Sequence, residues 1–281
     1  MSQSDPSSSD HRAEPSGSEP SALEPSGPDP SAGERARAHG AAGEASADRR
    51  ALLPDPAAFA HVREWVFDLD NTLYPRHTDL FSQIDVKMTD YVRDLLQLPR
   101  EEARALQKKY YREHGTTLAG LMANHGIDAN DFLEKVHDID YSWVDPDPAL
   151  GAAIAALPGR KFIFTNGDTR HAENTARALG VLEHFDDVFD IVAADLVPKP
   201  AASTYDKFVG LHRIDAARAA MFEDLPRNLT VPKRLGMRTV LIVPHNIAGA
   251  AFADWESEGR DDPDIDHVTD DLVAFLCRLL S

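Results

Sequence analysis

The sequence is poor in the features of disulfide-rich, secreted or membrane proteins. Its 281 residues include a single cysteine, Cys277, which excludes an internal disulfide and any zinc site built from several cysteines. No uninterrupted apolar run approaches the roughly 18 residues of a transmembrane helix. The first residues are acidic and lack an apolar segment, unlike a signal or transit peptide. We therefore expect a soluble, cytoplasmic protein.

Positive charge is also scarce. There are 29 Lys and Arg residues against 47 Asp and Glu, for a formal net charge of −18 at pH 7. A surplus of negative charge repels phosphate backbones and anionic lipids, so we expect neither nucleic acid nor a membrane as a partner. The hydrophobic content of 42% is enough for a sizeable core, and the length suits one or two domains.

The first 50 residues differ in composition from the rest of the chain. They contain no Phe, Trp or Tyr and consist mainly of Ser, Pro, Gly, Ala and acidic residues. Such a segment cannot bury enough apolar surface to offset the entropy that ordering it would cost. We therefore predict a disordered Ser/Pro/Glu-rich tail over residues 1–52.

The remaining sequence predicts an α/β fold with a helical insertion. A β-prone run, EWVF at 64–67, comes first, and apolar residues at helical spacing then extend through 76–157. After these, strand and helix patterns alternate, with strands predicted at 161–165, 190–193, 219–222 and 238–243. The alternation indicates a Rossmann-like core with a parallel sheet, formed by residues 53–75 and 158–281. Residues 76–157 would form a helical cap inserted after the first strand.

Polar side chains follow four of the predicted strands. They are Asp68, Asp70 and Thr72 after the first strand, Thr165 and Asn166 after the second, Lys199 after the third, and Glu223 and Asp224 after the fourth. The carboxyl ends of parallel strands meet at one edge of the sheet, where ligands bind. Several carboxylates side by side require a cation, and hard oxygen ligands select Mg²⁺. The sequence therefore predicts a magnesium site at this edge.

These residues lie in four motifs that resemble those of the haloacid dehalogenase (HAD) superfamily. The motifs are DLDNT at 68–72, TN at 165–166, Lys199, and EDLPRN at 223–228. Within the superfamily, the chain is similar to the pyrimidine 5′-nucleotidase group, through FDLDNTLYP at 67–75, YYREHGTTLAGL at 110–121 and FTNGDTRHA at 164–172. The resemblance implies a HAD-like phosphatase that acts on a small phosphate ester, first of all a nucleoside monophosphate such as UMP or CMP.

The resemblance also implies roles for the two acids of the first motif. Asp68 would be the nucleophile that forms an aspartyl-phosphate, and Asp70 would be the general acid and base. Dehalogenases of the superfamily lack a carboxylate at the position of Asp70, because a halide leaves without a proton, so Asp70 favours phosphoryl chemistry. A sugar-phosphate or phosphoglycolate phosphatase and a phosphomutase use the same residues and stay as alternatives. A non-catalytic scaffold that uses the tail would not need them.

By the same resemblance, the other motif residues bind the metal and the phosphate. Asp68, the main-chain carbonyl of Asp70 and Asp224 would hold Mg²⁺, with Glu223 either a direct ligand or an outer one. The phosphate would be bound by Thr165, Asn166 and Lys199, and Lys199 would also offset the charge of Asp68.

Substrate choice is expected to come from the cap, which would close over the site and exclude water. Tyr111, Thr116 and Thr117 are candidates to meet a base or a sugar, although Tyr111 fits the core of the cap equally well. His171, five residues after Asn166, fits either a substrate contact or packing at the start of a helix.

Overall fold

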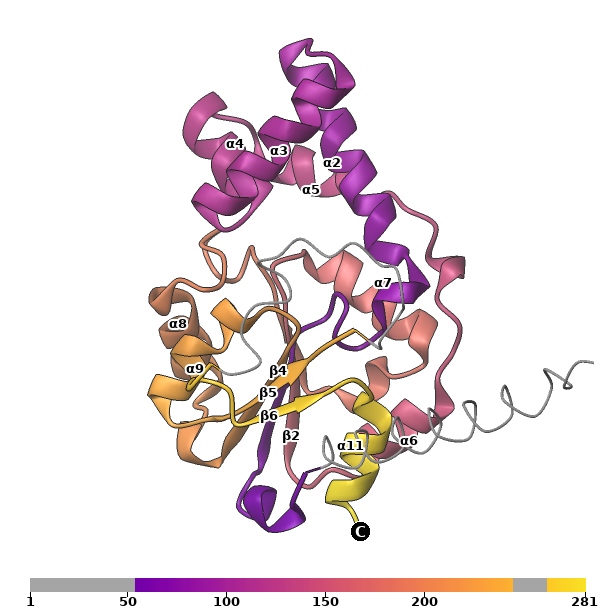
Figure 1. The fold of residues 1–281 in the computed structure, drawn as a ribbon, viewed down its shortest axis with the longest axis vertical. Coiled ribbons are helices and arrows are strands. Elements are labelled where there is room, and N and C mark those ends of the chain that lie inside the picture. The colour runs from indigo at the N-terminus through magenta and orange to yellow at the C-terminus, as the bar shows by residue number, and fades with distance from the viewer. Residues whose placement is uncertain (1–53, 245–261) are drawn as a thin grey trace, which may run out of the picture. The chain divides into compact units, whose positions relative to one another are not determined.

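The computed structural model describes residues 54–244 and 262–281, so the predicted tail of residues 1–52 lies outside the described residues. A six-stranded parallel sheet forms the centre of the described chain, in the order β3-β2-β1-β4-β5-β6 (Figure 1). The strands are β1 (Glu64–Phe67), β2 (Arg160–Phe164), β3 (Asp187–Phe189), β4 (Ala219–Glu223), β5 (Arg238–Ile242) and β6 (His267–Thr269). The central strands β1 and β4 are almost wholly buried, as in sheets that helices cover on both faces. The predicted α/β class is confirmed.

Two strands differ from the prediction. The strand predicted at 190–193 is wrong, because β3 ends at Phe189 and Asp190 instead holds a turn. The Asp190 carboxylate accepts hydrogen bonds from the main-chain N–H and the hydroxyl of Thr169, at 2.8 Å each, and from the N–H of Ala193 at 2.7 Å. The short strand β6 was not predicted, because three residues are too few for an alternating pattern.

Helices cover both faces of the sheet. Alternate residues of β1 belong to different apolar clusters, Trp65 and Phe67 to one and Val66 to the other, because successive strand residues point to opposite faces. The first cluster receives side chains from α6 (Pro148–Ala156), α7 (Thr169–Leu179) and α11 (Leu272–Leu279). The second receives them from α8 (Ala202–His212), and α9 (Thr230–Leu235) packs beside it.

Four helices between β1 and α6 form the inserted cap (Figure 1). They are α2 (Leu80–Leu96), α3 (Arg100–His114), α4 (Thr117–His125) and α5 (Ala129–Val136). They share a third apolar cluster, which includes Val92, Leu121 and Phe132. The expected cap of residues 76–157 also contains α6, whereas Leu150 and Ile154 of α6 belong to the cluster of the sheet.

Short 3₁₀ turns complete the described chain, at Pro56–Phe59, Arg76–Thr78, Tyr141–Trp143, Leu182–His184, Ala216–Arg218 and Pro226–Asn228. None of the described helices combines the length and the hydrophobicity that a membrane span requires.

Candidate active site

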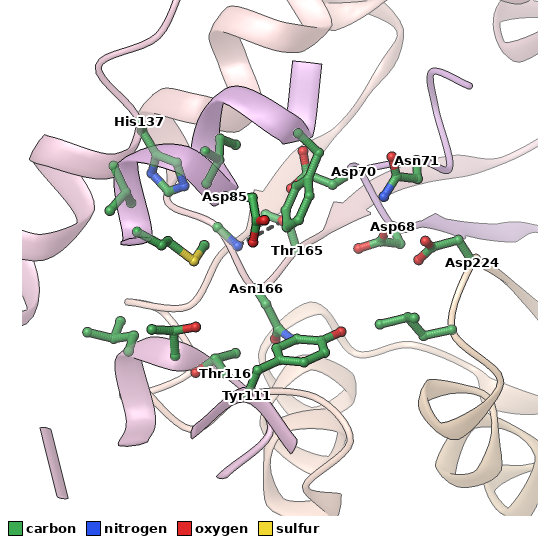
Figure 2. A pocket seen from close by; sticks show the side chains of 18 of the residues that line it. Asp68, Asp70, Asn71, Asp85, Tyr111, Thr116, His137, Thr165, Asn166 and Asp224 are labelled. Atoms are coloured by element: carbon green, nitrogen blue, oxygen red, sulfur yellow. Dashed lines mark hydrogen bonds between the residues drawn. The ribbon is translucent and has the colours of Figure 1, made fainter. Parts of the chain in front are cut away.

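The polar residues at the strand ends face one cavity, which the cap also lines (Figure 2). Its volume is about 380 Å³. From the sheet it is lined by Asp68, Asp70, Thr165, Asn166, Lys199, Glu223 and Asp224, and from the cap by residues that include Tyr111, Thr116 and Thr117. Two residues singled out from the sequence lie outside this lining, His171 and Thr72.

Lys199 is buried between two carboxylates. Its Nζ donates hydrogen bonds to Asp68 Oδ1, Glu223 Oε1 and the main-chain oxygen of Phe164, each at 2.7 Å. Burial by itself disfavours the ammonium, but the charges of Asp68 and Glu223 outweigh it and raise the pKa of Lys199. Lys199 is therefore a fixed positive charge next to Asp68.

Asp68 and Asp224 are carboxylates in a crowded, negative environment. Burial raises the pKa of Asp68 to about 7, against the effect of Lys199, and the charges of Glu223 and Asp70 add to the rise. Burial also raises the pKa of Asp224, with Glu223 and Asp68 adding to it and Arg76 opposing it. The Arg76 Nη2 atom lies 3.2 Å from Asp224 Oδ2. A further positive charge between the carboxylates of Asp68 and Asp224 would favour the ionised form of both.

Glu223 is held by the protein through both of its oxygens. Oε1 accepts hydrogen bonds from Lys199 Nζ at 2.7 Å and from Asn228 Nδ2 at 2.6 Å, and Oε2 accepts one from the N–H of Leu225 at 2.8 Å. Ligand oxygens of Asp68, Glu223 and Asp224 lie within 4.8 Å of one another. This set of oxygens fits a divalent cation such as Mg²⁺. Because the oxygens of Glu223 are already engaged, Asp68 and Asp224 are the carboxylates best able to hold it.

Asp70 is oriented by a buried histidine and a tyrosine. Its Oδ1 lies 2.9 Å from His171 Nε2 and accepts a hydrogen bond from the Tyr74 hydroxyl at 2.5 Å. Burial opposes ionisation, but His171 and Tyr74 prevail and lower the pKa of Asp70. The ring of His171 stacks on His137, with 4.5 Å between centroids, and its Nδ1 lies 3.2 Å from the Tyr141 hydroxyl. His171 therefore contacts a site residue and not the cavity.

Thr165 and Asn166 shape the loop after β2. The Thr165 hydroxyl oxygen accepts a hydrogen bond from the N–H of Gly167 at 2.9 Å. The Asn166 Oδ1 atom accepts one from the N–H of Lys199, also at 2.9 Å. Asn166 thus both lines the cavity and fixes the main chain that carries Lys199.

The cap meets the loop after β4 through Arg227. Its guanidinium carbon lies 4.7 Å from the centre of the Tyr111 ring, and its Nη2 lies 3.4 Å from the main-chain oxygen of Gly115. Thr116 begins α4 as its N-cap residue, and Thr117 is buried. Figure 2 shows Tyr111 and Thr116 on the opposite side of the pocket from Asp70.

Comparison with known proteins identifies the family. Residues 65–236, more than half of the chain, match the haloacid dehalogenase-like hydrolases. The chain belongs to this family. The HAD-like fold expected from the four motifs is thereby confirmed.

This HAD-like hydrolase is similar to other proteins over part or most of its length. It is 30% identical over 148 residues to Phosphate metabolism protein 8 of Saccharomyces cerevisiae, a match that covers 48% of the chain and 45% of that protein. The chain thus spans about half the length of this curated relative. Among solved structures, CbbY from Rhodobacter sphaeroides in complex with phosphate is 18% identical, with a TM-score of 0.51 over 76% of the chain and 96% of CbbY. The 2-haloacid dehalogenase of Pseudomonas syringae pv. Tomato is 19% identical, with a TM-score of 0.46 over 78% of the chain and 98% of that enzyme.

The sequence patterns did not identify several polar residues that line the cavity, among them Arg76, Asp85 and Lys108. Arg76 lies 148 positions from its partner Asp224, and no local pattern predicts a contact over that separation. Asp85 and Lys108 lie on amphipathic helices of the cap. The periodicity of such a helix predicts which face is buried, but it does not predict which part of the helix faces the sheet domain.

Proposed function

We propose that this hydrolase is a Mg²⁺-dependent phosphatase. It would cleave small phosphate monoesters through an aspartyl-phosphate on Asp68, with pyrimidine nucleoside 5′-monophosphates as its first substrates. The observation that carries the proposal is the pair Asp68 and Asp70, which line one cavity beside the buried cation Lys199. The similarity to Phosphate metabolism protein 8 supports an activity in phosphate chemistry.

The first step forms a bond between Asp68 and phosphorus. A carboxylate oxygen of Asp68 attacks the phosphoryl group while the ester oxygen leaves, which divides one difficult displacement into two easier ones. Lys199, 2.7 Å from Asp68, favours the ionised nucleophile against the effect of burial and would offset the charge of the phosphate. Thr165 uses its oxygen to accept from Gly167, so its hydroxyl proton is left to donate to a phosphoryl oxygen. Asn166 would contribute its side-chain amide.

Asp70 would manage the proton in both steps. It protonates the leaving alkoxide and later takes a proton from the water that attacks the aspartyl-phosphate, which releases phosphate and restores Asp68. Both hydrogen bonds from His171 and Tyr74 reach Oδ1, which leaves Oδ2 to exchange the proton. Because its pKa is lowered, Asp70 must take up one proton before the first cycle. The proton that it takes from the attacking water then restores the acid form for the next cycle.

The metal would be held by Asp68, Asp224 and the main-chain carbonyl of Asp70. When bound, Mg²⁺ offsets the negative charge of the phosphoryl oxygens. Burial and mutual repulsion raise the pKa of both Asp68 and Asp224, so a cation is needed to keep the two acids ionised together. Glu223 would act as an outer residue that positions Lys199.

The cap side of the cavity supports a nucleotide as the substrate. Its lining includes a group of apolar side chains, among them Ile84, Met88, Leu118, Phe132 and Val136. A flat nucleobase buries apolar surface against such walls, whereas a sugar phosphate or phosphoglycolate would leave them in contact with water. The cavity volume of about 380 Å³ lies within the usual range for small-molecule sites.

The test is phosphate release from UMP, CMP, AMP, phosphoglycolate and sugar phosphates, with Mg²⁺, with EDTA, and with the Asp68→Asn protein. We expect release that requires Mg²⁺ and Asp68 and is fastest for UMP and CMP. Faster release from phosphoglycolate or a sugar phosphate would retain the mechanism and contradict the base preference. No release from any ester would contradict the whole proposal.

A further inference from the structure

Lys108 places an ammonium group on the cap wall of the cavity. It lies on α3, one residue after Gln107 and three before Tyr111, and all three residues line the cavity. Positions three and four apart lie on the same face of a helix, so this face of α3 is turned toward the site. The next residue, Lys109, is exposed and does not line the cavity.

The position of Lys108 is fixed by a carboxylate that is itself held in place. Lys108 Nζ lies 2.7 Å from Asp85 Oδ1 on α2. The same oxygen accepts a hydrogen bond from Gln107 Nε2 at 2.6 Å, and Gln107 Oε1 accepts one from the hydroxyl of Thr89 at 2.8 Å. Gln107 is only 2% exposed. An exposed ion pair usually loses much of its energy to side-chain entropy. Here the partly buried Asp85 is itself held by the buried Gln107, which restricts where the ammonium lies.

Lys108 has donors left for a ligand. An ammonium group offers three N–H donors. Within residues 54–244 and 262–281, Lys108 gives one hydrogen bond, to Asp85. The other oxygen of Asp85 lies 3.3 Å from Arg104 Nη1, so the charge of Asp85 is shared between two cations. The ammonium can therefore donate to an acceptor inside the cavity without breaking its anchor.

The surrounding charges favour an uncharged acceptor over a second anion. Asp79, at the start of α2, lines the cavity together with Asp85 and Lys108. With Arg104, the four groups carry two negative and two positive charges, so a carboxylate or second phosphate on the substrate would gain no net attraction here. A carbonyl oxygen needs only the donor, and the apolar side chains of Met88 and Phe132 suit the faces of the ring that carries it.

We propose that Lys108 determines specificity by donating a hydrogen bond to a carbonyl oxygen of a pyrimidine base whose phosphate group lies at Asp68. This inference rests on the proposed function and identifies the residue that selects the substrate. UMP and CMP both carry a carbonyl group on the base, AMP carries none, and ribose 5-phosphate has no base at all.

The experiment compares the Lys108→Met and Lys109→Met proteins with the wild type on these four substrates and on phosphoglycolate, which carries a carboxylate. We expect Lys108→Met to lower kcat/KM for UMP and CMP about tenfold more than for AMP or ribose 5-phosphate, mainly through KM. Lys109→Met makes the same chemical change on the outer side of α3, so the order of substrates should stay as in the wild type. Lys108→Arg keeps a donor and should recover part of the loss. Thermal unfolding of each protein checks that the cap is folded.

An equal loss on all four substrates, or no loss, would overturn the role of Lys108. A larger loss on phosphoglycolate than on UMP would assign Lys108 to a carboxylate and would also overturn it. Failure of the proposed function is distinguished by the wild type, which would then release no phosphate from any ester. In that case the affinity for UMP, measured by calorimetric titration, decides the inference. The role of Lys108 requires that UMP bind more weakly to Lys108→Met than to the wild type and to Lys109→Met.

Discussion

The strand ends and the cap wall face the same cavity but are built differently. At the strand ends, Lys199 joins Asp68 and Glu223 in a buried network in which hydrogen-bond distances of 2.6 to 2.7 Å leave little freedom. The cap wall combines apolar side chains such as Met88 and Phe132 with polar ones, among them the ammonium of Lys108, which Asp85 anchors. Transition-state charges must be met by groups that are already in place, whereas a substrate body is selected by shape and by a few donors. The difference suggests that chemistry and specificity can be changed separately.

The largest expected effect tests the strand ends. Replacing the proposed nucleophile in Asp68→Asn should lower kcat by at least about 10⁴-fold for every substrate, because the proposed mechanism has no other group that forms the covalent intermediate. The substitution removes a carboxylate whose pKa is already raised to about 7, so the protein should stay folded. Turnover assays beside thermal unfolding check both points. Substantial turnover by a folded Asp68→Asn protein would refute covalent catalysis at this residue.

Asp70→Asn should have the next largest effect and should depend on the leaving group. Loss of general acid and base catalysis typically costs about 10²–10⁴-fold. The loss should be greater for UMP than for p-nitrophenyl phosphate, because nitrophenolate needs no proton to leave. Rapid-quench measurement of aspartyl-phosphate separates the two steps. Equal losses for the two substrates in the phosphorylation step would argue against Asp70 as the acid.

Lys199→Met should destabilise the sheet domain by about 3–5 kcal/mol, because it leaves Asp68 and Glu223 buried without their cation. Added Mg²⁺ should restore part of this stability if Asp68 is a metal ligand. Lys207→Met is the matched control, since Lys207 pairs with Asp195 at the surface and should contribute less than about 1 kcal/mol. Thermal unfolding with and without Mg²⁺ measures the stability of the two variants. An equal loss of stability in the two variants would contradict the role of Lys199 in stabilising the two buried carboxylates.

Phe132→Ala tests whether the cap is a separate unit of stability. Phe132 is 2% exposed in the cluster of the cap, and its truncation should cost about 3–5 kcal/mol. Hydrogen exchange should rise in α2 to α5 and stay low in β1 and β4. Phe208→Ala removes a side chain of equal size from the cluster of the sheet and should affect the strands instead. Faster exchange throughout the chain in both variants would show one cooperative unit.

The smallest effect concerns Asp266, which lies away from both regions. Burial opposes its ionisation, but Lys233 and the N–H of Thr239, 3.1 Å away, outweigh burial and lower its pKa. Its contribution is thus present above the ordinary Asp pKa of about 4 and is lost as the pH falls through the lowered value. Asp266→Asn should cost about 1–3 kcal/mol at pH 7 and less near pH 3. Denaturant unfolding at the two pH values measures this, and an equal cost at both would refute it.

The polar residues at the ends of β1, β2 and β4 were predictable because each ends or follows a strand that the sequence pattern identifies. Asp68, Thr165 and Glu223 directly follow or end strands of one parallel sheet, and such sheets bring their carboxyl ends together. The boundary of the cap was less predictable. The composition of α6 is helical like that of the cap, and its assignment to the sheet depends on contacts with α11, more than 100 residues later.

The sequence by itself determined the α/β class, the inserted helices and the set of polar groups at the strand ends, because these follow from local periodicity and short motifs. Only the tertiary structure decided which distant residues contact the side chains of the cavity and hold them in place. His171 meets Asp70 across 101 positions, Arg76 meets Asp224 across 148, and Lys108 is held by Asp85 on another helix. Such contacts depend on how helices pack in three dimensions, and the spacing of residues along the chain carries no record of that packing.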